Sequence, residues 1–122
     1  MSDVKPRPIS INLHKKSRVL SISFDNGESF DLSCEYLRVH SPSAEVMGHG
    51  PGQEILQTGK ENVNITEIEP TGHYAIKLYF DDGHDTGIYT WDYLYDLGIN
   101  HDEFWKRYLQ ALEKAGIRRN LQ

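Results

Sequence analysis

Two stretches of the chain repeat one pattern of hydrophobic and polar positions. Residues 19–38 read VLSISFDNGESFDLSCEYLR, and residues 75–95 read AIKLYFDDGHDTGIYTWDYLY. In each copy, alternating residues lead to an Asn-Gly or Asp-Gly pair, which is typical of a β-strand that enters a hairpin turn. A short returning strand and a helix preceded by serine or threonine follow. The sequence therefore predicts two units of strand, turn, strand and short helix.

Alternation also predicts a strand before each copy. Residues 8–14 have hydrophobic residues at every second position, and residues 62–69 form a second candidate strand that Pro70 would end. The Asn26-Gly27 pair favours a type I′ turn, because both residues tolerate positive φ. These strands predict short antiparallel hairpins.

Capping residues set the expected helix boundaries. Ser33 and Thr90 precede the two short helices, and Gly98 would end the second helix in the left-handed conformation. Asn100, with a glutamate three residues later, is typical of a capping box that starts a longer C-terminal helix. Gly116 would stop that helix.

These elements predict an α+β fold of short antiparallel β-hairpins, two short helices and a longer C-terminal helix. We expect one domain over residues 1–122, with a core from about residue 9 to residue 116. The chain is 38% hydrophobic and 11% aromatic, which predicts a small core rich in rings. The expected core aromatics are Phe24, Phe30, Tyr74, Phe80 and Trp91.

The distribution of charge excludes one class of partner. Residues 21–105 contain three basic residues against sixteen acidic ones, while both ends of the chain are basic and the net charge is -5. An acidic body repels a phosphate backbone, so we expect no nucleic-acid binding. No apolar run is long enough for a membrane span or a signal peptide, and Cys34 has no second cysteine as a partner. We therefore expect a cytoplasmic protein with no membrane contact, in which Cys34 is structural.

The segment 40–60 is rich in Gly, Pro and Ser and has no hydrophobic period, so it is expected to be one long loop. Loops of this length are often functional. His40 and His49 flank Glu45 within the segment, and His84 follows the second hairpin turn. These four residues are the candidate metal ligands, although their spacing matches no recognised metal motif and surface histidines fit the same pattern. No catalytic constellation is visible, so we expect no enzyme.

Three segments carry a family resemblance: LRVHSPSAE from Leu37, GHG from Gly48 and FDDGHDTGIYTWDYL from Phe80. Together they resemble the DUF971 family of small bacterial proteins, which are similar to the N-terminal domain of gamma-butyrobetaine hydroxylase. The resemblance spans about residues 9–116. In the full-length hydroxylases a separate domain carries the iron, the 2-oxoglutarate and the chemistry. The resemblance therefore implies a stand-alone accessory domain without hydroxylase activity.

The resemblance also implies a comparison with a zinc module. The hydroxylase domain has three cysteines that are joined by one histidine. Those cysteine positions fall here on Ser41, Ser43 and Val46, and the histidine falls on His84. Serine is a poor zinc ligand and valine is none, so we expect no zinc and no other cofactor. Hydrogen bonds from Ser41, Ser43 and Glu45 are expected to close the position instead.

The leading interpretation is a non-catalytic accessory or protein-interaction domain with an unidentified protein partner, and weak homo-oligomers are compatible with it. The alternative is a metal-binding or iron–sulfur-related helper that uses the loop histidines, because similar domains occur fused to ATPases of the iron–sulfur carrier type. The expected interaction surface consists of Arg38, Ser41, Ser43, Glu45, His49 and His84.

Overall fold

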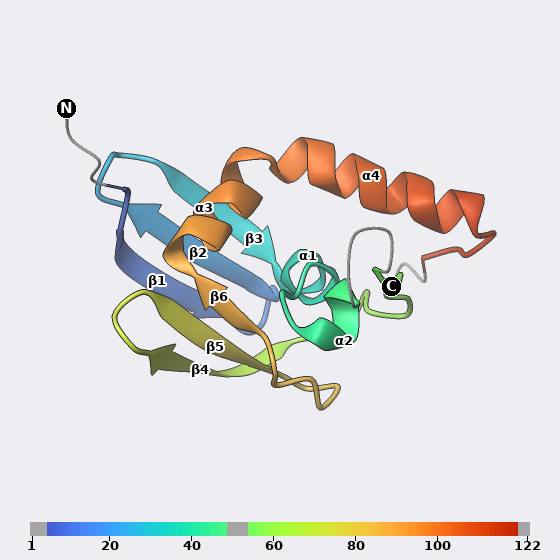
Figure 1. Ribbon diagram of the computed structural model, residues 1–122, viewed down its shortest axis with the longest axis horizontal. Coiled ribbons are helices and arrows are strands. Elements are labelled where there is room, and N and C mark those ends of the chain that lie inside the picture. The colour runs from blue at the N-terminus through green and yellow to red at the C-terminus, as the bar shows by residue number, and fades with distance from the viewer. Residues whose placement is uncertain (1–4, 49–53, 120–122) are drawn as a thin grey trace.

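The computed structural model describes residues 5–48 and 54–119, and over these ranges the chain forms two three-stranded antiparallel sheets and four helices (Figure 1). The first sheet has the order β1 (Pro8–His14), β2 (Val19–Phe24) and β3 (Ser29–Ser33). The second has the order β4 (Ile65–Thr71), β5 (Ala75–Phe80) and β6 (Ile88–Thr90). The helices are α1 (Cys34–Val39), α2 (Ala44–Met47), α3 (Trp91–Ile99) and α4 (His101–Lys114). The α+β fold class is confirmed.

The two hairpin turns of the repeat are built alike, but they are not type I′ turns. In the first turn, Phe24 N–H donates to Glu28 O at 2.8 Å and Gly27 N–H donates to Phe24 O at 3.1 Å. The same two bonds recur in the second turn, and Gly27 and Gly83 have φ of 91° and 89°. Asn26 does not share the positive φ that a type I′ turn needs, so each turn is a glycine-bulged one.

Side-chain caps begin the two repeat helices as expected. Ser33 Oγ accepts from Tyr36 N–H at 3.0 Å, and Thr90 Oγ1 accepts from Tyr93 N–H at 3.1 Å. Each cap satisfies one backbone donor that the first helical turn leaves without a partner. The strand–turn–strand–helix unit therefore occurs twice, as β2-β3-α1 and as β5-β6-α3.

The expected end of α3 at Gly98 is wrong, because the helix continues through this glycine to Ile99. A methyl group at Gly98 would overlap the ring of Phe30 on β3, so the glycine permits close packing and does not end the helix. The expected capping box is also wrong. The side chain of Asn100 makes no cap bond and donates to Asp96 O at 3.0 Å. Gly116, with φ of 72°, follows the end of α4 as expected.

Two further boundaries differ from the sequence-based expectation. Pro70 lies inside β4 and does not end it. This is tolerated because β4 is an edge strand, where one N–H on the outer side can be lost. The segment 40–60 is not one continuous loop, because it contains α2, at whose start Ser43 Oγ accepts from Glu45 N–H. A helix of four residues is too short to show a hydrophobic period.

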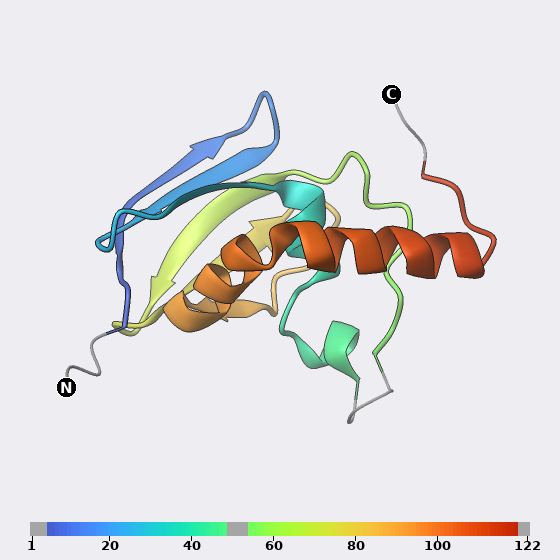
Figure 2. The ribbon, with the colours of Figure 1, turned by 90° about the horizontal axis from the view of Figure 1, so that it is seen from above.

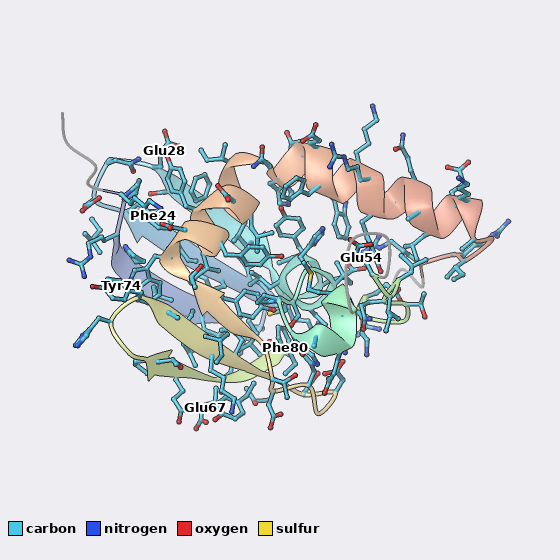
Figure 3. All side chains as sticks on the ribbon, viewed as in Figure 1. Phe24, Glu28, Glu54, Glu67, Tyr74 and Phe80 are labelled. Atoms are coloured by element: carbon cyan, nitrogen blue, oxygen red, sulfur yellow. The ribbon has the colours of Figure 1, made fainter. Side chains whose placement is uncertain are left out.

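One core joins both sheets to the repeat helices. The two views show α3 crossing the sheets, and α4 continuing beyond their end, where α1 and α2 also lie (Figure 1, Figure 2). Phe24 and Phe80 are buried as expected, and Phe30 and Trp91 pack against the same core. Tyr74 does not belong to it, because its side chain lies at the rim of the molecule and is 68% exposed (Figure 3). None of the helices in the described ranges is long and apolar enough to cross a membrane.

Candidate functional site

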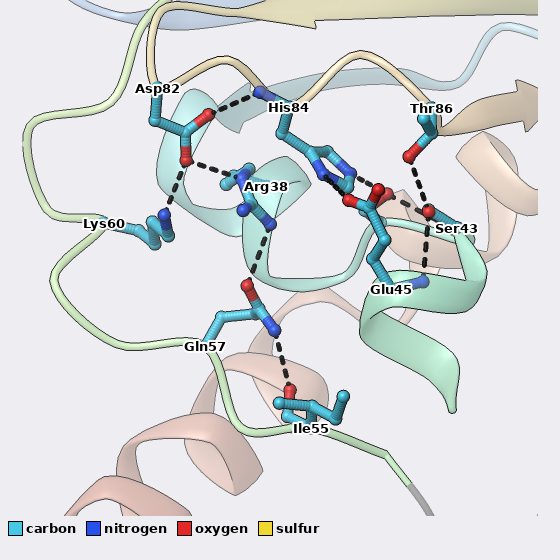
Figure 4. Close-up of polar contacts among 10 residues, drawn as sticks. Arg38, Ser43, Glu45, Ile55, Gln57, Lys60, Asp82, His84 and Thr86 are labelled. Carbon is cyan, nitrogen blue, oxygen red and sulfur yellow. Dashed lines mark hydrogen bonds and ion pairs between the residues drawn. The ribbon is translucent and has the colours of Figure 1, made fainter. Parts of the chain in front are cut away.

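A buried polar cluster joins the exit of the first repeat unit to the turn of the second (Figure 4). Its centre is His84, which is only 5% exposed. The ring Nε2 lies 2.8 Å from Ser41 Oγ, and the ring Nδ1 lies 3.0 Å from Glu45 Oε2. The turn presents the ring in this position because His84 N–H donates to Asp82 Oδ1 at 3.1 Å. We call this cluster the His84 hub.

The surroundings of His84 favour a neutral ring. A carboxylate only accepts, so Nδ1 carries a proton and donates to Glu45. In the neutral ring Nε2 has no proton, and it accepts from the hydroxyl of Ser41. Burial lowers the pKa of His84, and the charge of Arg38 acts in the same direction, while Glu45 opposes both. The desolvated site therefore favours the uncharged form.

Ser43 and Gly87 close the hub on the side of β6. Ser43 Oγ lies 2.7 Å from Thr86 Oγ1 and also accepts from Glu45 N–H at 3.2 Å. Gly87 leaves the space that Ser41 fills, because a methyl group at Gly87 would overlap the serine hydroxyl. The hydrogen bonds that the sequence predicted for Ser41, Ser43 and Glu45 are thus present.

An ion-pair network continues the hub on the other side. Asp82 Oδ2 accepts from Arg38 Nε at 2.8 Å and from Lys60 Nζ at 2.6 Å. Burial acts to raise the pKa of Asp82, but the bonds from Lys60, from the His84 backbone and from Arg38 outweigh it and lower this pKa to about 2. Asp82 is therefore a carboxylate at neutral pH, and it fixes Arg38 on α1.

Arg38 then connects the hub to the segment that follows residue 53. Its Nη1 donates to Gln57 Oε1 at 3.0 Å, and Gln57 Nε2 donates to Ile55 O at 3.0 Å. From the other side, Tyr108 Oη on α4 donates to Gln57 O at 2.7 Å. Figure 2 shows residues 54–60 passing α4 at this point. The hub thus determines where this segment lies.

A groove of about 540 Å³ lies between this segment and α4. Val39, Val46 and Phe104 are among the residues that line it. Three apolar side chains at its wall are exposed to solvent, namely Met47, Ile55 and Leu56. Exposed apolar side chains that gather around a concave surface are typical of binding sites.

Residues 11–95 match the family model described as gamma-butyrobetaine hydroxylase-like, N-terminal. The chain belongs to this family. No curated protein matches it.

Three solved structures resemble this family member over most of its length. Two proteins solved by NMR in solution are 51% and 54% identical to it, each with a TM-score of 0.81; the alignments cover 94% and 98% of this chain and 90% and 89% of theirs. A crystal structure of a DUF971 protein of unknown function from Acidithiobacillus ferrooxidans is 41% identical, with a TM-score of 0.63 and coverage of 75% and 91%. The resemblance to DUF971 is confirmed.

The zinc that the hydroxylase domain suggests does not fit the residues of this family member. The four corresponding positions hold Ser41, Ser43, Val46 and His84, which are two hydroxyls, an alkyl group and one imidazole. Val46 is buried and offers no donor atom, and both ring nitrogens of His84 already have partners within the chain. Zinc in proteins is held by thiolate, imidazole and carboxylate groups, so this set is unsuited to it.

The candidate metal ligands do not come together in the described residues. His40 lines the groove rather than the hub, because its Nδ1 bonds to Tyr36 O at 2.9 Å one helical turn earlier. His49 lies outside the described residues. Within residues 5–48 and 54–119, no group of three or more His, Cys, Asp or Glu is placed to hold a metal ion. Of the three candidates within the described residues, Glu45 and His84 are in contact and His40 is not part of that contact.

The hub contains one arrangement that the sequence did not reveal. Ser41, His84 and Glu45 are bonded in the order of a serine–histidine–acid triad. The serine of such a triad must reach a substrate. Ser41 has no exposed surface, and its Oγ also accepts from Ser43 N–H at 3.3 Å. The arrangement is therefore suited to holding the fold and not to attacking a substrate.

The expected surface residues have different roles in the structure. Ser41, Ser43 and His84 are buried, so they support a surface rather than form one. Sequence reasoning missed Gln57, Lys60, Asp82 and Tyr108, which link the hub to the groove. The only signal for Asp82 was its place in a turn, where aspartate is common for backbone reasons.

Proposed function

We propose that this domain is a non-catalytic protein-interaction module that binds an apolar segment of a partner protein in the groove between residues 54–57 and α4. The observation that carries the proposal is the exposure of Met47, Ile55 and Leu56 around one groove of about 540 Å³. Burial of such side chains against a partner supplies the driving force for association. Methionine adapts to different partner shapes, which suits a binding surface.

The His84 hub acts in this proposal as the support of the groove. It holds α2, which carries Met47, through Glu45 and Ser43. It also positions the opposite wall through the bond from Arg38 to Gln57. Binding sites work best when a second layer of bonds fixes the contacting residues. We place this activity in the cytoplasm, where the unpaired thiol of Cys34 stays reduced.

The test uses the full chain with a photo-reactive benzoylphenylalanine at Leu56 and, as a matched control, at Ile9. Both side chains are exposed, but Ile9 lies on β1 and not in the groove. We expect crosslinking in the native host to one protein from position 56 and not from position 9.

The partner protein that the crosslink identifies is then purified by itself, and its affinity for the wild-type chain and for each variant is measured by calorimetry. Leu56→Asp should weaken binding about tenfold or more, because a charge at a desolvated contact is costly, and Ile9→Asp should leave the affinity unchanged. Unchanged affinity of a folded Leu56→Asp variant would overturn the proposal, as would crosslinking from position 9 alone. A crosslink between two copies of this chain would identify self-association as the interaction.

A further inference from the structure

The chain after α4 turns back and brings one arginine to α1. We call residues 115–119 the strap. Gly116 makes the turn with φ of 72°, and Ile117 N–H donates to Leu112 O at 2.9 Å. Figure 1 shows the strap leaving the end of α4 and returning toward α1. Arg119 is the last described residue of the chain.

Arg119 fills a site that matches a guanidinium group on two sides. Its Nε lies 2.9 Å from Glu35 Oε2, and its Nη2 bonds to Glu35 Oε1, so the contact is bidentate. The guanidinium carbon also lies 5.1 Å from the centre of the Trp105 ring. A planar fork that meets a carboxylate and stacks on an aromatic ring is a contact that arginine makes and lysine cannot.

The site needs a cation. The Glu35 side chain is 7% exposed, and within the described residues its carboxylate receives hydrogen bonds from Arg119 alone. The hydrogen bonds that Arg119 donates to Glu35 raise the pKa of Arg119, and the charge of Glu61 acts in the same direction. A buried carboxylate without such a partner would be costly.

The fold holds Glu35 and Trp105, which form the site, more firmly than it holds Arg119, which fills it. Glu35 lies on α1 next to Tyr36, a fully buried core residue, and the Trp105 ring is 6.2 Å from the Tyr36 ring. Arg119, in contrast, lies beyond the last helix on a strap, and part of its side chain is exposed. The two sides of the site therefore do not depend on the strap for their position.

We propose that Glu35 and Trp105 form a binding site for an arginine side chain, that Arg119 fills this site within the chain, and that an arginine presented by a partner protein can replace it. The acidic composition of residues 21–105, with sixteen acids against three bases, favours the approach of a basic segment. This site does not depend on the groove, because neither Glu35 nor Trp105 lines it.

The test opens the site in the full chain with Arg119→Ala and titrates it with N-acetyl-arginine amide. Binding is followed by NMR at the indole N–H of Trp105. We expect saturable binding, on the order of millimolar for a single side chain. The wild-type chain should bind the probe at least about tenfold more weakly than Arg119→Ala does, because Arg119 competes for the site at high effective concentration. N-acetyl-lysine amide and the double variant Glu35→Gln/Arg119→Ala are the matched controls, and neither should show saturation.

Absence of saturable arginine binding to Arg119→Ala would overturn the proposal. Equal binding of the lysine probe, or arginine binding that survives Glu35→Gln, would also overturn it. If Arg119→Ala does not fold, the titration is made with Arg119→Lys, which keeps the positive charge but not the bidentate fork. The arginine probe should then displace the lysine, and failure to do so would count against the proposal.

Discussion

The ring of His84 bonds to the hydroxyl of Ser41 across 43 residues of sequence, at 2.8 Å and without solvent access to Ser41. Ser41 follows the helix of the first repeat unit, and His84 follows the turn of the second. The bond therefore ties the two units together at the position where the related hydroxylase domain is expected to hold zinc.

The first prediction concerns His84→Ala. The loss of one exposed hydrogen bond would cost about 1 kcal/mol, but His84 is buried and uses both ring nitrogens. Its removal leaves a buried serine hydroxyl without this partner and creates a cavity, so we expect a loss of about 2–4 kcal/mol in the free energy of unfolding. Urea unfolding followed by tryptophan fluorescence measures this loss.

The matched control is His73→Ala, because His73 is exposed and only its backbone oxygen bonds to another side chain, that of Trp91. This variant should change the free energy of unfolding by less than about 0.5 kcal/mol. Equal effects of the two substitutions would show that the hub does not stabilise the fold.

The second prediction concerns pH. Burial lowers the pKa of both His84 and His40. The unfolded chain therefore binds protons at these positions near the ordinary pKa of about 6.5, before the folded chain does. The stability that the two neutral histidines contribute should be fully present above that pH. The free energy of unfolding should fall as the pH drops from about 7 to about 5.5. His84→Gln should flatten this profile, whereas His73→Gln should not. The measurement is the melting temperature of the wild type and of both variants at constant ionic strength across this pH range. A melting temperature that rises with acidification would contradict the expectation.

The strands and helix starts of the repeat could be predicted because their signals are local. Alternation identified β2 and β5, and Ser33 and Thr90 cap their helices as the sequence indicated. The role of Gly98 could not be found in this way. It depends on the ring of Phe30, which lies 68 residues earlier and meets the helix only in the folded chain.

The candidate site was predictable only in part. The family resemblance brought Ser41, Ser43, Glu45 and His84 together, and they do meet. His40 was grouped with them because of its proximity in sequence, but it bonds to its own helix and packs beside Phe104 in the groove. The groove itself is formed by side chains from all four helices and from residues 54–57, and no local pattern reports such a tertiary surface.

The third prediction concerns Gly98→Ala. Alanine favours a helix by about 1 kcal/mol over glycine, which alone would stabilise α3. Here the added methyl group would overlap the Phe30 ring, and overpacking costs about 1–3 kcal/mol. We therefore expect a net loss of stability in chemical denaturation. The same substitution in a Phe30→Leu background should cost less, and an equal cost in both backgrounds would show that Phe30 is not the reason for the glycine.

The fourth prediction concerns Cys34, which is fully buried. Its Sγ lies 3.6 Å from Asn64 Oδ1, and burial raises the pKa of the thiol. Both effects reduce the amount of accessible thiolate, which is the reactive form. Ellman's reagent should therefore react with the native chain at least about ten times more slowly than with the urea-unfolded chain. Equal rates would show that the thiol is accessible in the folded protein.

The most direct measurement is the melting temperature of the untagged protein before and after dialysis against a strong chelator. A structural zinc contributes on the order of 10 kcal/mol to the folding of small zinc modules. If the hydrogen bonds of Ser41, Ser43, Glu45 and His84 hold this position instead, the melting temperature should stay the same. Unfolding on chelation, with recovery when zinc is returned, would contradict the account.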